Sequence, residues 1–449
     1  MKSNIEASIK WLQEQPSDLV KIGLTDIDGV LRAKYLKRSK VISALEKGFG
    51  FCDVIFGWDV EDQLYGNFRT SAGFPDARAR LVPESLRTIP WENDIPFLLA
   101  DLYHSDSPLA NACPRSVLIK VIERARAIGF EPRFGPEYEW FVYRETPTSL
   151  VEKDYHNPEP LSPGMFGYSG LRTSQNSEFH HDLFQQLAAF DVELEGLHTE
   201  TGPGVLEAAV LHQPALEAAD RAQLFKQGVK EISYRHGLLS SFMAKPSADL
   251  PGCGGHLHQS LWRDGQNLFY AADRPNNMSQ LFEHYLAGQL AVLPYLMPLL
   301  APTVNSYKRY VSGSWAATRM NWGVDNRTVA LRVIRGDEQA TRLETRLPGA
   351  DANPYLAIAA ALNAGLYGIE HKLSLDTAAV EGSAYEQTIG QQLSQDLGQA
   401  VSRMRDSELP NQLLGEGFVD HFLSTRDWEW QQYQQAVTDW ERSRYFELV

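Results

Sequence analysis

The spacing of hydrophobic and polar positions in the C-terminal three-quarters of the chain predicts strands that alternate with helices. Apolar residues at every second position mark strands, and apolar residues three or four apart mark helices. The predicted strands include the one with Glu137 to Val142, 238–244, the one with His256 to Ser260, 326–332 and 342–346. The predicted helices are 114–128, 177–189, 214–235, 279–292 and 354–370, followed by a helical tail. Residues 149–176 are rich in Pro, Gly and Ser, which favours a loop.

The N-terminal region has a different pattern. Residues 19–36 alternate around Asp28-Gly29, which predicts a β-hairpin, and a short helix at 39–47 is expected to end at Gly48. Proline and charge density change around 103–114, so we place a domain boundary near residue 105. The predicted domains are therefore residues 1–105 and 106–449.

Composition narrows the class of protein. The chain has 449 residues, of which 43% are hydrophobic and 22% charged, so a folded globular protein is expected. The net charge of −15 argues against nucleic acid or an anionic membrane as a partner. Three scattered cysteines and an N-terminus without an apolar segment typical of a signal peptide indicate a cytoplasmic location. The longest apolar run, 286–304, contains three prolines, which favours a buried helix followed by an extended segment over a membrane span.

Charged residues recur at every second position in three of the predicted strands. Arg342, Glu344 and Arg346 share one strand face, as do Glu137 with Glu139 and His256 with His258. A further pair, Glu200 and Glu207, brackets the turn Thr201-Gly202-Pro203-Gly204. One such pair alone is more often a solvated strand edge, but four pairs supply the oxygen and imidazole ligands that Mg²⁺ or Mn²⁺ prefers. The pattern predicts a two-metal site on a sheet.

The common nucleotide and hydrolase motifs are absent from the sequence. There is no G-x-x-x-x-G-K-[ST] segment, and Glu207 occupies the third glycine position of a possible G-x-G-x-x-G at Gly202. There is also no G-x-S-x-G motif. Any bound phosphates must therefore be held by metals and by four arginines that lie within twenty residues of one another: Arg327, Arg332, Arg342 and Arg346.

Several segments in a fixed order resemble the glutamine synthetase family over nearly the full chain. They are GPEYEWF, HTETGPGVLEAAV, GCGGHLHQS, NSYKRY, DNRTVALR and RLETRLPGADANPYLA. The resemblance implies an α+β fold: a small N-terminal β-grasp domain, then a glutamine-synthetase-type catalytic domain with a curved antiparallel sheet flanked by helices. It also implies a homo-oligomer, a dodecamer of two hexameric rings with active sites between subunits.

The resemblance also implies roles for individual residues, with ATP as co-substrate and two or more Mg²⁺ or Mn²⁺ ions per site. The first metal would be held by Glu139, Glu200 and Glu207, and the second by Glu137, His256 and Glu344. Arg327 would reach the transferring phosphoryl group. The nucleotide would contact Glu195, His212, His258, Ser260, Arg332 and Arg342. Glutamate would be bound by Gly252, Arg309 and Arg346.

The ammonia side departs from the family pattern. The glutamate expected six residues after Arg309 is Trp315, and the N-terminal ammonium-binding aspartate aligns with Cys52, beside Asp53. The asparagine expected before Gly252 is Pro251. An indole offers apolar area and a cation–π face in place of a carboxylate. These differences resemble the γ-glutamyl–amine branch of the family, the polyamine and monoamine synthetases, with Asp53 as the remaining candidate base.

The leading interpretation is an ATP- and Mg-dependent ligase that joins the γ-carboxyl of L-glutamate to an organic amine through a γ-glutamyl phosphate. The small-molecule partners would be glutamate, ATP and the amine. An ordinary glutamine synthetase and a non-catalytic structural relative are the alternatives. The acidic residues Asp53, Asp59, Glu61 and Asp62 would suit a polyamine, whereas Trp315, Trp58 and Phe56 would suit an alkyl or aryl monoamine.

Overall fold

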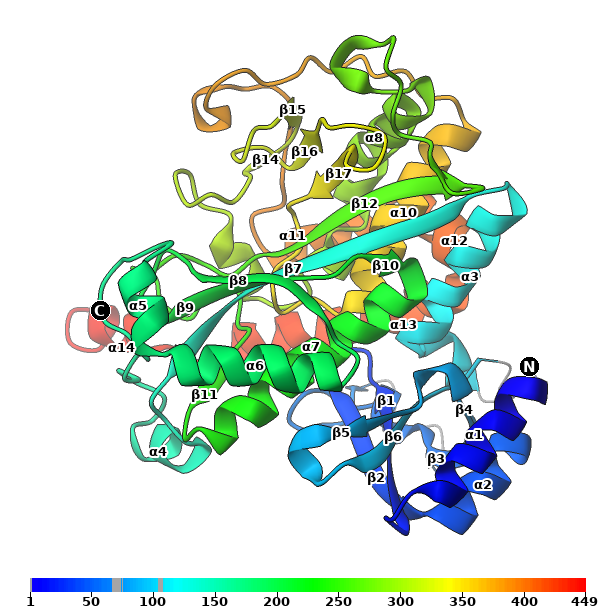
Figure 1. Cartoon of the computed structure of the whole chain (residues 1–449). Helices are drawn as coiled ribbons and strands as arrows, with labels where there is room; N and C mark the ends of the chain where they lie inside the picture. Colours follow the sequence, from blue (N-terminus) through cyan, green and yellow to red (C-terminus); the bar gives the residue numbers. More distant parts are fainter. Residues whose placement is uncertain (1, 67–73, 75, 104–107) are drawn as a thin grey trace.

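The chain folds around two β-sheets that lie on opposite sides of a helical layer (Figure 1). The computed structural model describes residues 2–66, 74, 76–103 and 108–449. The predicted domain boundary at residue 105 lies outside the described residues. A third, two-stranded pairing joins β14 (Arg319–Met320) to β18 (Gln391–Gln392). The predicted α+β class is confirmed.

The N-terminal sheet has the strand order β2-β1-β6-β4-β3, with β5 beside β6. The predicted hairpin is confirmed: β1 and β2 pair antiparallel, and Asp26 Oδ1 accepts hydrogen bonds from the backbone N–H groups of Asp28 and Val30 at the turn. The predicted helix at 39–47 is also confirmed, whereas the first helix was not foreseen. The strands are β1 (Leu19–Thr25), β2 (Leu31–Lys37), β3 (Phe49–Cys52), β4 (Asp76–Leu81), β5 (Arg87–Ile89) and β6 (Ile95–Asp101); the helices are α1 (Lys2–Glu14), α2 (Arg38–Lys47) and the short η1 (Asp53–Phe56).

The larger sheet has the order β15-β16-β17-β12-β7-β9-β8, with β10 and β11 beside β7 and β13 beside β12. Its pairings are antiparallel except for β15 with β16, which is parallel. The two long strands β7 and β12 run side by side across the molecule (Figure 1). The strands are β7 (Glu131–Tyr143), β8 (Leu194–Thr199), β9 (Val205–Val210), β10 (Gln213–Pro214), β11 (Leu239–Ser241), β12 (Gly255–Arg263), β13 (Gln266–Asn267), β15 (Trp322–Val324), β16 (Leu331–Ile334) and β17 (Arg342–Thr345).

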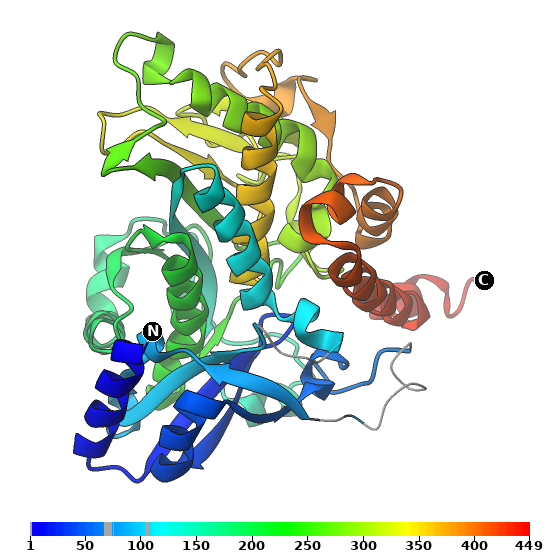
Figure 2. The same ribbon diagram turned by 90° about the vertical axis from the view of Figure 1, so that its right-hand side faces the viewer.

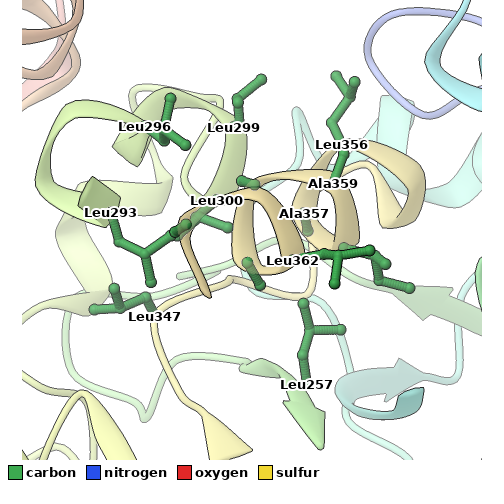
Figure 3. Packing of buried hydrophobic residues seen from close by; sticks show 14 of the residues in the cluster. Leu257, Leu293, Leu296, Leu299, Leu300, Leu347, Leu356, Ala357, Ala359 and Leu362 are labelled. Carbon is green, nitrogen blue, oxygen red and sulfur yellow. The ribbon is translucent and has the colours of Figure 1, made fainter. Parts of the chain in front are cut away.

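Two hydrophobic cores hold the helices against this sheet. Tyr138 and Trp140 of β7 pack with α6 and α7, whereas Leu257 and Leu343 of β12 and β17 belong to the core around α8 and α10. Figure 3 shows leucines and alanines of α10 packed against leucines of neighbouring segments. The helices are α3 (Pro114–Ala127), α4 (Pro147–Glu152), α5 (Gly170–Gln175), α6 (Ser177–Ala189), α7 (Ala215–Arg235), α8 (Gln280–Val292), α9 (Met297–Leu300), α10 (Pro354–Glu370), α11 (Leu397–Arg405), α12 (Leu409–Leu414), α13 (Glu416–Gln435) and α14 (Asp439–Tyr445).

Helices α8 and α10 approach each other closely because glycines line their contact. A Cβ atom on Gly288 would lie 2.3 Å from the carbonyl oxygen of Ala364, and one on Gly368 would lie 2.1 Å from that of His284. Asn353 caps α10 by accepting from the backbone N–H of Tyr355, and its amide donates to the carbonyl of Asp26 in the N-terminal hairpin. The cap of the central helix thus also contacts the N-terminal sheet.

Several predicted elements differ from the structure. Residues 149–176 are not wholly loop, because they contain most of α4 and all of α5. The strand expected at 326–332 begins only at Leu331, since Asn326 accepts from the N–H of Thr328 and forms a turn first. The strand expected at 238–244 is only three residues long. The segment after α8 contains two short helices instead of an extended stretch. Among the described residues, no helix is both long and apolar enough to cross a membrane.

A buried ion network connects the N-terminal sheet to the helices of the larger domain. Arg115, on α3, donates from Nε and Nη2 to both carboxylate oxygens of Asp220 on α7, at 2.9 and 3.0 Å. Its Nη1 donates to Asp101 at the end of β6, at 2.6 Å. Tyr355 on α10 donates its hydroxyl to Asp220. The four side chains are buried, so one guanidinium shared by two carboxylates links the sheet end to three helices.

Candidate active site

Strand register brings the predicted metal ligands opposite one another. His256 pairs with Glu137, Glu139 with Glu207, and His258 with Glu344 across neighbouring strands. Directly opposed residues project to the same face of a sheet, so charges spaced at every second position along each strand gather in one place. The site therefore forms because the charged residues occupy every second position and because the strands lie in the order β17-β12-β7-β9.

The intervening residues of the same strands form a buried polar network on the opposite face. Gln259 Nε2 donates to Thr345 Oγ1 at 2.7 Å, and Gln259 Oε1 accepts from Tyr285 and Gln289 of α8. Thr345 in turn donates to Gln289 Oε1 at 2.7 Å. Apart from the alternation itself, no sequence pattern predicts this network. It fixes β12 against β17, and therefore the position of His258 relative to Glu344.

Two groups of side chains have the composition of a metal site. Glu137, His258 and Glu344 form one, and His198, Glu200 and Glu207 form the other. His256 is also placed for the first group, because its Nδ1 lies 3.2 Å from Glu137 Oε1 and 3.5 Å from Glu344 Oε1. His198 was missed by sequence reasoning, although its place two residues before Glu200 on β8 repeats the alternation seen elsewhere.

Hydrogen bonding distinguishes the two imidazoles on β12. Arg342 Nε donates to Nδ1 of His258 at 3.1 Å. A neutral imidazole that accepts at Nδ1 carries its proton on Nε2, so this nitrogen, 3.6 Å from Glu137 Oε2, is a donor and not a free metal ligand. His256 has no arginine on Nδ1 and faces two carboxylates with that atom. The contacts therefore favour His256 over His258 as the imidazole ligand.

The carboxylates lie close together, and their negative charges shift one another's pKa values. Burial, together with the charges of Glu137 and Glu139, raises the pKa of Glu207 to about 7 despite a hydrogen bond to His198. Burial and the nearby Glu200 also raise the pKa of Glu139. Such mutual destabilisation of buried negative charges is relieved by divalent cations. The residues present thus fit hard metal ions with oxygen ligands.

Two cavities meet at Glu137. One, of about 350 Å³, contains most predicted metal, phosphoryl and glutamate positions: Glu139, Glu200, Glu207, Gly252, His256, Arg309, Trp315, Arg327, Arg332, Glu344 and Arg346. The other, of about 510 Å³, contains five of the six predicted nucleotide positions: Glu195, His212, His258, Ser260 and Arg342. The sixth, Arg332, lies in the first cavity. Nearly all predicted site residues are therefore brought to two adjoining spaces.

The arginines of the first cavity have unused hydrogen-bonding capacity. The Nε atoms of Arg309, Arg332 and Arg346 are buried, and none has a hydrogen-bond partner among the described residues. Arg332 Nη1 lies 3.0 Å from Glu344 Oε2, and Arg346 also pairs with Glu344. Unsatisfied buried donors are costly, so these guanidiniums are suited to anionic groups such as carboxylate and phosphate. Gly252 must lack a side chain, since a Cβ there would lie 2.6 Å from Arg309 Cγ.

Trp315 lies in an exposed loop at the edge of the first cavity. Its φ angle is 59°, its side chain is 59% exposed, and its carbonyl accepts from Arg346 Nη2 at 3.2 Å. Tyr168 lines the same cavity and stacks on His198 with ring centroids 4.4 Å apart; sequence reasoning missed it. A bulky residue at positive φ is strained, so the loop is held by surrounding contacts such as that to Arg346.

One predicted catalytic residue is not brought to the site of this chain. Asp53 lies on η1 in the N-terminal sheet region, is buried, and lines neither cavity. Its predicted role requires it to act on the site of a neighbouring subunit.

Comparison with known proteins gives the family. The model for the glutamine synthetase catalytic domain matches residues 111–445. The chain is 49% identical to type-1 glutamine synthetase 2 of Dictyostelium discoideum, covering 96% of this chain and 84% of that protein. It is 34% identical to glutamate–isopropylamine ligase of a Pseudomonas species, covering 98% and 97% of the two chains. The solved structure of the GmaS/ADP complex superposes with a TM-score of 0.85 at 29% identity, covering 98% and 99%.

The family model and these relatives define the protein as an ATP-dependent carbon–nitrogen ligase. The chain belongs to the glutamine synthetase family. Members of this family use ATP with Mg²⁺ or Mn²⁺ and are typically oligomeric. The family includes amine–glutamate ligases, such as the γ-glutamylethanolamide synthetase of Streptomyces coelicolor, which is 34% identical over 96% of this chain and 93% of that protein.

Proposed function

We propose that this protein joins the γ-carboxyl of L-glutamate to an organic amine at the cost of ATP, through a γ-glutamyl phosphate intermediate. The observation that supports the proposal is the set of acidic residues that line the first cavity. Its five lining carboxylates, those of Glu137, Glu139, Glu200, Glu207 and Glu344, all belong to the predicted metal set. Among the described lining residues, no further acid is left to bind ammonium, and Trp315 stands where the family has one.

The side chains divide the chemistry between them. The carboxylates and His256 would hold two divalent ions, which supply charge neutralisation for phosphoryl transfer when bound. Arg309 and Arg346 would bind the α-carboxylate of glutamate, since their free Nε atoms can add donors in a planar arrangement. Arg327 would stabilise the transferring phosphoryl group, while the residues of the second cavity would hold the nucleotide.

The amine must lose a proton before it can attack the acyl phosphate. A primary alkylamine has an unperturbed pKa of about 10, so it arrives charged and needs a base. Asp53 of a neighbouring subunit is the proposed base, and this assignment accompanies the proposal of a dodecamer of two hexameric rings. Trp315 and Tyr168 would give the organic substituent apolar contact. A cytoplasmic location remains part of the same proposal.

The experiment is an acceptor profile. Phosphate release is measured with ATP, Mg²⁺ and glutamate across ammonium, short alkylamines, ethanolamine and diamines. Burial of one CH₂ contributes about 0.8 kcal/mol, so a substituent of a few carbons should raise kcat/KM about a hundredfold over ammonium. A kcat/KM for ammonium equal to or above that of every amine would show that the protein makes glutamine, the alternative suggested by the name of its Dictyostelium relative.

A substitution in the loop sharpens the test. Trp315→Glu should shift selectivity toward ammonium, because it adds a carboxylate at the cavity. Val311→Glu is the matched control: Val311 lies in the same loop and is 49% exposed, but does not line the cavity. If both variants shift selectivity equally, the shift comes from the added negative charge of the loop and not from its position at the cavity. The acceptor pocket would then lie elsewhere.

A further inference from the structure

The residues proposed to bind glutamate come from three separate segments of the chain. Gly252 lies in the loop between β11 and β12, Arg309 ends the short helix η8 (Ser306–Arg309), and Arg346 directly follows β17. The loop and η8 lie outside the sheet, so strand register does not fix the relative positions of these residues. Other contacts must therefore hold them together.

Asn305 ties η8 to the loop that contains Gly252. Its Oδ1 accepts from the backbone N–H of Lys245 at 2.8 Å, and its Nδ2 donates to the carbonyl of the same residue at 3.0 Å. An asparagine just before a helix usually accepts from an N–H of the first turn, but within η8, all of which is described, Asn305 has no such donor. Both ends of its amide hold the backbone of Lys245 instead.

The side chain of Lys245 extends this contact along the loop. Its ammonium donates to the carbonyl of Leu250, and only Pro251, whose ring restricts the backbone, separates Leu250 from Gly252. A Cβ atom on Gly252 would lie 2.6 Å from Arg309 Cγ, so the far end of the loop packs directly on the arginine. The path from Asn305 through the loop therefore returns to η8.

A carboxylate holds the same stretch of chain from the side of Arg346. Asp351 Oδ2 accepts from the hydroxyls of Thr303 and Ser306, at 3.0 and 2.5 Å. Asp351 belongs to the segment that follows Arg346. The entry to η8, residues 303–306, is therefore bonded to both of the other segments that supply glutamate-binding residues.

We propose that Asn305 is a positioning residue for glutamate, because it holds the loop of Gly252 against Arg309 through the backbone of Lys245. The described residues that line the two cavities do not include Asn305, so it acts through these residues and does not touch the substrate. The inference rests on the glutamate site of the proposed function, but not on which amine is the acceptor.

The test is glutamate binding, which does not depend on the acceptor. L-Glutamate is titrated by calorimetry into the full-length protein with Mg²⁺ and ADP present, and ADP is titrated separately with Mg²⁺ alone. Asn305→Leu keeps the approximate shape of the side chain and removes both amide contacts. It should raise the Kd for glutamate about tenfold, since a binding group that is loosely supported loses much of its effect. The Kd for ADP should stay the same.

Asn363→Leu is the matched control, because it also removes an amide that is bonded at both ends. Asn363 is fully buried in α10, where it donates to the carbonyl of Leu413 and accepts from Arg124. This variant should lower the urea midpoint of unfolding at least as far as Asn305→Leu, yet leave the Kd for glutamate unchanged. An equal rise of that Kd in both variants would indicate a general loss of stability and overturn the proposal.

Lys245→Met gives a second test if Asn305→Leu does not fold. It removes the ammonium contact to Leu250 and should also raise the Kd for glutamate without changing that for ADP. Unchanged glutamate binding in the folded variants refutes the positioning role alone. Wild-type protein that binds no glutamate refutes the glutamate site and the positioning role together.

A double variant tests the route through Gly252. In Gly252→Ala the added methyl group must displace Arg309, so the relative position of the two residues is already altered. Adding Asn305→Leu should then raise the Kd for glutamate by less than the product of the two single effects, as expected for residues that act on one contact. Effects that multiply fully would show that Asn305 acts independently of Gly252, contrary to the proposal.

Discussion

Glu344 provides the sharpest test of the charge arrangement at the site. Its carboxylate is 1% exposed and lies between Arg332, Arg346 and His256. Burial alone would raise its pKa, but the charges of Arg346, His258 and His256 outweigh this and lower it from the ordinary 4.5 to about 2. Each pKa unit corresponds to about 1.4 kcal/mol, so the ionised carboxylate stabilises the fold by about 3 kcal/mol at neutral pH.

The perturbation is Glu344→Gln, which keeps the shape and removes the charge. Urea unfolding at pH 7 in EDTA, followed by tryptophan fluorescence, should show a free energy of unfolding lower by about 3 kcal/mol, similar to the cost of breaking a buried ion pair. The folded pKa is below the unfolded one, so wild-type stabilisation is present above about pH 4.5 and lost as the pH falls toward 2. The difference between the two proteins should shrink in the same window.

Glu338→Gln is the control for this prediction, because it removes one negative charge from an exposed position in the loop before β17. It should change the free energy of unfolding by less than about 0.5 kcal/mol. Equal stability of Glu344→Gln and wild type at pH 7 would refute the reasoning. It would mean that the two arginines are satisfied by solvent and that Glu344 serves only as a ligand.

Three further predictions follow from other contacts. Arg309→Ala and Arg346→Ala should each raise the KM for glutamate tenfold or more, which corresponds to a loss of about 1.5–3 kcal/mol of binding free energy. Steady-state kinetics should show a nearly unchanged KM for the amine. Because the pKa of Glu207 is about 7, Mg²⁺ must displace a proton below that pH; calorimetry should show affinity falling about tenfold per pH unit there, and Glu207→Gln should remove the dependence. Arg115→Met should lower the free energy of unfolding by about 3–5 kcal/mol, because Asp101 and Asp220 are left buried and unpaired; a loss below 1 kcal/mol in urea titration would contradict this.

Period-two spacing made the centre of the site predictable, because side chains on one strand face must emerge together. The sequence could not give the strand order, and so could not show that Glu139 would oppose Glu207. The family resemblance gave the grouping, and the register is consistent with it. His198 was missed although it lies two residues before Glu200, and Tyr168 was missed because a single tyrosine in a turn carries no pattern of its own.

The errors in the fold arose where local turns competed with a strand pattern. The β-branched residues Thr328 and Val329 favour a strand, yet Asn326 accepts a hydrogen bond from the N–H of Thr328 in a turn, and β16 begins only at Leu331. The helices α4 and α5 were hidden in a polar stretch because their caps, Thr146 and Ser169, resemble ordinary loop residues. Figure 2 shows how the N-terminal sheet and the C-terminal helices come together from the two ends of the chain.

Some residues of the candidate site lie on paired strands and others on an exposed loop, and this difference has a consequence for evolutionary change. The acidic side chains on β7, β9 and β17 and the two histidines on β12 are held by strand register and by the buried amide network behind them, so altering one of these strands disturbs all the others. Trp315 is on an exposed loop that contacts the cavity from outside the sheet. Trp315 contributes a carbonyl contact to Arg346 but no strand pairing, so substitutions there disturb fewer contacts than changes in the strands. Under the proposed function, the nitrogen donor could therefore change by small steps in this loop while the strands stay as they are.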